Sequence, residues 1–166
     1  MSYKFNVQST IGGVPVDFAT AQLSDPAFHE KVCYRLPATD LVITESSLAG
    51  SQYTLKREYN LDVNIPDIAR KFLKSAFRLR REDFWNLAQL NAESHFYMNM
   101  PGEFHSRTVM KHDANGIHIH QDWEVIIRVP LIHNLLAKHA EAEIRRFRDI
   151  ELDIIRDELS KAFQAA

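Results

Sequence analysis

Residues 130–163 read PLIHNLLAKHAEAEIRRFRDIELDIIRDELSKAF, and this stretch decides the fold. Proline is favoured in the first turn of a helix, where its missing N–H has no partner to lose, so Pro130 marks the expected start. No glycine or proline follows between Leu131 and Phe163. The stretch therefore predicts one helix, roughly 45 Å long at ~1.5 Å per residue.

Apolar residues recur along this helix at alternating steps of three and four, which is the pattern of one buried face. They are Ile132, Leu136, Ala140, Ile144, Phe147, Ile150 and Ile154. A coiled coil has the same pattern. We favour packing on the protein's own sheet, because the strands that precede the helix need their apolar faces covered.

A second apolar stripe, Leu152, Ile155, Leu159 and Phe163, lies on another side of the same helix near its end. An exposed apolar stripe of this kind docks a partner or a second copy of the chain. A homodimeric interaction protein is therefore one of the functions that the sequence suggests.

The chain before the helix consists mainly of stretches with the period of two that is typical of half-buried strands. The predicted strands are 3–11, 78–90, 93–101, 104–113 and 117–129, together with a hairpin over 39–63 that is broken at 49–51. The predicted short helices are 14–23, 25–36 and one that is opened by Pro66 and extends to Phe77. This order predicts an α+β fold in which a bent antiparallel sheet packs against the long helix.

Composition limits the class of protein further. The chain has 166 residues, 45% apolar and 25% charged, which suits one globular domain spanning 1–166. The net charge of −2 gives no positive field for phosphate backbones, so nucleic acid is not an expected partner. A single cysteine, Cys33, and the lack of a secretory signal or a long apolar segment lead us to expect a cytoplasmic protein without an integral membrane segment.

Three segments resemble a known superfamily. They are Ser24-Asp25-Pro26-Ala27-Phe28, Ile65-Pro66-Asp67-Ile68-Ala69-Arg70-Lys71-Phe72 and Ile126-Ile127-Arg128-Val129-Pro130-Leu131. Together with the order of elements, they resemble the helix-grip fold of the START-like (SRPBCC) superfamily, and most closely an uncharacterised bacterial branch of it, a domain family of unknown function. The resemblance implies a hydrophobic cavity between sheet and helix, which superfamily members mostly use to bind lipids, sterols, polyketides or other apolar molecules.

Charged residues on faces predicted to point inward mark the candidate site. Arg57 lies between Leu55 and Tyr59 on such a face, and an unpaired buried guanidinium is costly, so it needs a partner, which Glu143 on the long helix could supply. The predicted ligand-binding residues are Arg57, Tyr59, Arg81, Asp83, Trp85, Trp123, His139 and Glu143. The alternative is that these charges form ordinary structural ion pairs or reach the rim.

His118, His120 and Asp122 repeat along one strand face, as in a facial metal triad. Their face is opposite to that of Ile119 and Trp123, so they are expected to point away from the core, and we predict no metal site and no cofactor.

No conventional catalytic motif occurs in the sequence. The expected function is therefore binding of a hydrophobic or amphipathic small molecule, lipid-like in character. The alternative is a cyclase- or hydrolase-type enzyme that uses His139 and Glu143 for acid/base chemistry on a bound ketone.

Overall fold

The computed structural model describes residues 2–73 and 75–166. One seven-stranded antiparallel sheet has the order β1-β7-β6-β5-β4-β3-β2. Its strands are β1 (Ser2–Ile11), β2 (Ala38–Ala49), β3 (Gln52–Leu61), β4 (Arg78–Asn86), β5 (Asn91–Met98), β6 (Gly102–Asp113) and β7 (Gly116–Ile127). The helices are α1 (Val16–Leu23), α2 (Pro26–Arg35), α3 (Asp67–Arg70) and α4 (His133–Ala165).

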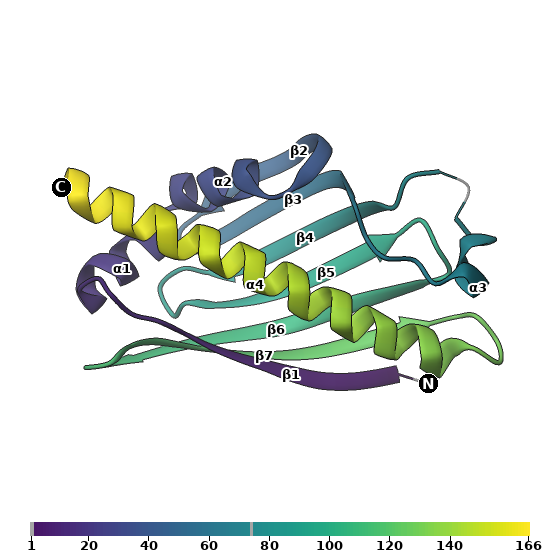
Figure 1. Ribbon diagram of the computed structural model, residues 1–166. Coiled ribbons are helices and arrows are strands. Elements are labelled where there is room, and N and C mark those ends of the chain that lie inside the picture. Colours follow the sequence, from purple (N-terminus) through teal and green to yellow (C-terminus); the bar gives the residue numbers. More distant parts are fainter. Residues whose placement is uncertain (1, 74) are drawn as a thin grey trace.

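The long helix α4 crosses one face of the curved sheet, with α1 and α2 beside its C-terminal half (Figure 1). The inward face of each strand follows from its alternation. In β3 the buried residues are Tyr53, Leu55, Arg57 and Tyr59, and the residues between them are only partly buried. The predicted α+β fold class is confirmed. Within the described residues, no helix combines the length and the apolar character that a membrane crossing requires.

The start of α4 differs from the prediction. The helix begins at His133, three residues after Pro130. Leu131 has a φ of 72°, in the left-handed region that residues with a Cβ rarely adopt, and it is 98% exposed. This backbone conformation cannot belong to a right-handed helix, so Pro130 lies in the preceding turn rather than in the first helical turn.

The helix predicted to follow Pro66 is also wrong in length, because α3 has only four residues. Beyond it the chain turns, and by Phe77 it is extended beside β3, where Leu61 N donates to Phe77 O over 3.0 Å. Pairing with the sheet therefore replaces the helix that the apolar spacing predicted. Lys74, which falls in the predicted helix, lies outside the described residues.

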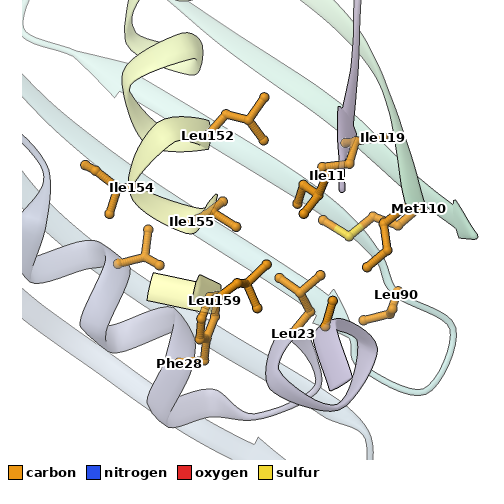
Figure 2. Packing of buried hydrophobic residues seen from close by; sticks show 13 residues of the cluster. Ile11, Leu23, Phe28, Leu90, Met110, Ile119, Leu152, Ile154, Ile155 and Leu159 are labelled. Atoms are coloured by element: carbon orange, nitrogen blue, oxygen red, sulfur yellow. The ribbon is translucent and has the colours of Figure 1, made fainter. Parts of the chain in front are cut away.

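The C-terminal half of α4 lies in a buried apolar cluster. Figure 2 shows Leu152, Ile155 and Leu159 directed at side chains from α1, α2, β1, β6 and β7. The prediction that this stripe is an exposed docking surface is wrong for these three residues, because α1 and α2 cover this end of the helix. Phe163 alone remains 44% exposed, with its ring edge on Phe18 at 5.3 Å between centroids.

The N-terminal half of α4 faces a second cluster that is rich in aromatic rings. It includes Tyr59, Phe96 and Trp123 from the sheet and Ile144 from the helix. The rings of Phe96 and Phe104 stack at 4.7 Å, and Trp123 lies 5.3 Å from Phe96. These rings form the wall of the cavity described next.

Candidate ligand-binding cavity

A cavity of about 190 Å³ lies between the inner face of the sheet and α4. Since one water needs only ~10–15 Å³ of such space, the cavity has room for a small organic molecule. Strands β3 to β7, helix α2, segment 63–66 and the inner face of α4 all contribute side chains to its wall. Most of these side chains are apolar, and a few polar groups converge among them, which is the usual character of a ligand site.

All eight residues predicted from the sequence line this one cavity: Arg57, Tyr59, Arg81, Asp83, Trp85, Trp123, His139 and Glu143. The alternation of the strands was sufficient to place the first six, because a period of two fixes the face on which each side chain lies. The contacts among the eight differ from the predicted ones.

Asp83 is the centre of a buried ionic cluster on β3 and β4. Arg57 Nη2 donates to Asp83 Oδ2 over 3.0 Å, and Arg81 Nε lies 3.1 Å from the same carboxylate. Ser94 Oγ donates a third bond of 2.6 Å. The predicted pairing of Arg57 with Glu143 is therefore wrong, because Asp83 lies one strand away on the same face and reaches Arg57 without any contribution from the helix.

Glu151 and Arg148 extend this cluster to α4. Arg81 binds Glu151 in a bidentate manner, with distances of 2.8 and 3.2 Å, and Arg148 Nη1 lies 3.4 Å from Glu151 Oε1. Sequence reasoning missed both helix residues. A signal existed, since 148 and 151 fall at helical steps of four and three between Ile144 and Ile155, on the buried face.

Electrostatic interactions keep this cluster ionised. Burial alone would raise the pKa of the Asp83 carboxyl, but Arg81 and Arg57 outweigh burial and hold its pKa below the ordinary value. Burial is likewise outweighed at Glu151, whose pKa Arg81 holds far below the usual range of a glutamate. At Arg148 burial prevails, so its pKa is lowered despite the nearby Glu151. Arg148 is thus the arginine of this cluster whose charge is least well compensated.

A row of small polar side chains continues the cluster across the inner face of the sheet. Ser94 faces Asp83 on β4 and Ser106 on β6, and Ser106 in turn faces Trp123 on β7. Both serines are buried and line the cavity. Beside them Gln121 Nε2 donates to Thr108 Oγ1 over 3.0 Å. The cavity therefore has one polar band between apolar and aromatic walls.

His139 and Glu143 lie where segment 62–66 meets α4. His139 Nε2 is hydrogen-bonded to the backbone carbonyl of Asn64, and the Asn64 side chain approaches Glu143 at 3.4 Å. Glu143 also pairs with Arg146 at 2.6 Å. Among the described residues no hydrogen bond joins His139 to Glu143. The two side chains hold the segment against the helix, and their geometry does not form the acid/base pair that the enzyme alternative requires.

His29 of α2 also lines the cavity, and sequence reasoning found no role for it. Its Nε2 donates to Leu23 O over 2.7 Å, and its ring lies 4.8 Å from that of Trp85. Burial lowers the pKa of His29 below its ordinary value, so the imidazole is neutral at pH 7.

The histidines of β7 lie outside the cavity, as their face predicted. His118 contacts Asp113 at 2.9 Å, whereas His120 contacts Asp122 at 3.0 Å, so the two imidazoles have separate carboxylate partners. Within residues 2–73 and 75–166, no group of three metal-binding side chains comes together.

Comparisons with known proteins agree with this architecture. The model of a family described as "Protein of unknown function (DUF2505)" matches residues 6–159, whereas no curated protein matches the sequence.

Similar solved structures share the fold at low sequence identity. The protein TTHA0849 from Thermus thermophilus has a TM-score of 0.64 at 12% identity, over 96% of this chain and 99% of that one. The ZhuI aromatase/cyclase from Streptomyces sp. R1128 has 0.63 at 11%, over 97% and 95%. Ara h 8.0201 has 0.64 at 10%, over 97% and 99%. The expected helix-grip fold is confirmed.

Proposed function

Since this chain belongs to the DUF2505 family, whose function is unknown, we propose a function from its cavity: binding of a hydrophobic or amphipathic small molecule between the sheet and α4. The observation that carries the proposal is the cavity itself, whose aromatic and aliphatic walls enclose one polar band. Apolar walls supply affinity by removing ligand surface from water, and a few fixed polar groups orient the ligand.

The shared fold is compatible with this proposal but does not establish it, because one fold serves many functions. An aromatase/cyclase is among the similar structures, so an enzymatic function is the alternative to ligand binding. In this chain, however, His139 and Glu143 are bonded to segment 62–66 and to Arg146 rather than to each other. We therefore favour binding over catalysis.

The uncharged fluorescent probe N-phenyl-1-naphthylamine tests the proposal, because its emission rises when it enters an apolar cavity. We expect saturable binding that a filled cavity abolishes. Ala140 lines the cavity, so Ala140→Phe should place a ring inside it. Ala142, two residues along α4, is exposed, and Ala142→Phe is the matched control that should bind the probe like the unmodified protein.

Equal probe binding by the two phenylalanine variants would contradict a site between sheet and helix. Absence of saturable binding by the unmodified protein would contradict the proposed function itself. Native mass spectrometry of the purified protein gives an independent measurement, in which a retained small molecule should be seen with Ala142→Phe and lost with Ala140→Phe.

A further inference from the structure

The ionic cluster of the cavity carries an excess of positive charge. Its members are the guanidinium groups of Arg57, Arg81 and Arg148 and the carboxylates of Asp83 and Glu151, so three positive charges face two negative ones. Arginine stays protonated at any physiological pH, and both carboxylates are ionised. His29 adds no charge because it is neutral at pH 7.

The other carboxylate of the cavity wall, Glu143, does not balance this excess. It is paired at 2.6 Å with Arg146, whose side chain is 44% exposed. One net positive charge therefore remains in a region where the side chains of Arg57 and Arg148 are only 4% and 8% exposed. An uncompensated buried charge is expensive, and an anion in the cavity would offset it.

Unused hydrogen-bond donors accompany the unbalanced charge. Among the described residues, Arg57 Nε, Arg148 Nε and Trp123 Nε1 are buried without a hydrogen-bond partner. All three side chains line the cavity. Each of the three nitrogens of Arg81, by contrast, donates a hydrogen bond to Asp83 or Glu151. The free donor capacity thus lies on Arg148, Arg57 and Trp123, and an acceptor bound in the cavity would use it.

We propose that the cavity takes an amphipathic ligand with a single carboxylate, bound by Arg148 with Arg57 and Trp123 as further donors, while its apolar part lies against the aromatic wall. This inference rests on the proposed function and names the class of ligand for the same cavity. It assigns Arg148 as the main determinant of ligand charge, since its only carboxylate contact among the described residues is the long one of 3.4 Å to Glu151.

The single excess positive charge of the cavity favours one class of anion. A carboxylate carries one charge and two coplanar acceptors, which match the fork of a guanidinium. A phosphate monoester carries ~1.5–2 negative charges at pH 7 and would overcompensate a site with one net positive charge. An alcohol would leave the charge unbalanced, and a cationic head would add to it.

The experiment compares four ligands with the same ten-carbon chain: decanoate, decanol, decyl phosphate and decyltrimethylammonium. The protein has two tryptophans, Trp85 and Trp123, and both line the cavity, so intrinsic fluorescence reports binding directly. Because a hydrogen bond to a charged group is stronger than a neutral one, we expect decanoate to bind roughly tenfold to hundredfold more tightly than decanol. Decyl phosphate should bind less tightly than decanoate, and the cationic amphiphile least tightly.

Arg148→Met tests the assigned residue, with Arg145→Met on the exposed side of α4 as its matched control. Arg148→Met should remove the preference for decanoate over decanol, whereas Arg145→Met, whose side chain does not line the cavity, should retain it. Circular dichroism checks that the variants fold, and Arg148→Lys, which keeps the charge, should retain part of the preference.

The outcomes separate this inference from the proposed function. Equal affinities for decanol and decanoate, or a preference that survives in Arg148→Met, would overturn the carboxylate site while the hydrophobic binding site stands. Tighter binding of decyl phosphate would overturn the choice of carboxylate. If none of the four ligands perturbs the fluorescence or competes with the neutral probe, the proposed carboxylate site is wrong. If the probe itself does not bind either, the proposed function is wrong as well.

Discussion

The two halves of α4 make different contacts with the rest of the protein. Its C-terminal half buries Leu152, Ile154 and Leu159 in an apolar cluster with side chains of α1, α2 and the sheet (Figure 2). Its middle and N-terminal half instead present Arg148 and Glu151 to a cavity. One regular helix thus serves as a core element at one end and as the wall of a candidate binding site at the other.

The difference shows which contacts stabilise the fold. Apolar burial at the C-terminal end anchors the helix on the sheet, since each fully buried aliphatic side chain contributes ~1.5–3 kcal/mol. The ionic cluster is weaker evidence for stability, because desolvation of buried charges offsets most of their attraction. Leucine would be the simpler choice for a stable core in the second half, and the charges there are the reason that we propose a binding role for it.

Loss of the central carboxylate should produce the largest effect. Asp83→Asn leaves Arg57 without its carboxylate partner and Arg81 with Glu151 alone. Breaking a buried pair in this way costs about 3–5 kcal/mol of the free energy of unfolding, measured by urea denaturation. Asp153→Asn, which removes the partner of Arg156 from the exposed face of α4, should cost less than ~1 kcal/mol. Similar losses in the two variants would mean that the cluster is not energetically distinct from a surface ion pair.

The same substitution, alanine to phenylalanine, in the apolar cluster and in the cavity wall tests this comparison further. Ala19 of α1 is buried in the apolar cluster, whereas Ala140 faces the cavity. Ala19→Phe should lower the free energy of unfolding by about 1–3 kcal/mol through overpacking. Ala140→Phe should cost less than ~1 kcal/mol, because the ring enters existing space. Equal destabilisation, measured from urea midpoints at an unchanged slope, would show that the two halves are packed alike.

The smallest expected effect concerns His29 of α2, which lines the cavity. Because burial lowers its pKa below the ordinary 6.5, the unfolded chain binds a proton in a pH range where the folded chain does not. The contribution of His29 is therefore present above pH ~6.5 and is lost as the pH falls toward its folded pKa.

His29→Gln should remove this part of the pH dependence, which for one proton is at most about 1.4 kcal/mol per pH unit. The measurement is urea unfolding between pH 7 and pH 5. The control is His112→Gln at an exposed site, which should leave the slope unchanged. A slope in His29→Gln identical to that of the unmodified protein would contradict the assignment of a neutral buried imidazole.

Arg57 and Asp83 show which features of the site could be predicted from the sequence and which could not. The period of two in β3 and β4 placed Arg57 and Asp83 on the inner face, because it depends only on the local backbone. It could not say that they pair with each other, since that depends on the register that joins Leu55 to Asp83 and Arg57 to Arg81. The pairing with Glu143 was predicted from the helix face alone, and the actual sheet register supplied a nearer partner.

The helix shows the same limit in another form. Apolar spacing identified α4 and its inner face, but the stripe at its end looked exposed because nothing local indicates that α1 and α2 pack there. The extent of the domain, residues 1–166, stays a prediction, as do the ligand-binding roles of the cavity residues.

The sequence by itself determined the fold class, the order of the elements and the inward-facing residues of the strands, because these depend on periodicity and turn chemistry along the chain. Only the tertiary structure decided which charges meet. The contacts of Arg81 with Glu151, 70 residues further along the chain, and of His139 with Asn64 depend on how the sheet bends toward α4. The unbalanced charge at Arg148 emerged only there, because it is a sum over side chains from three separate elements.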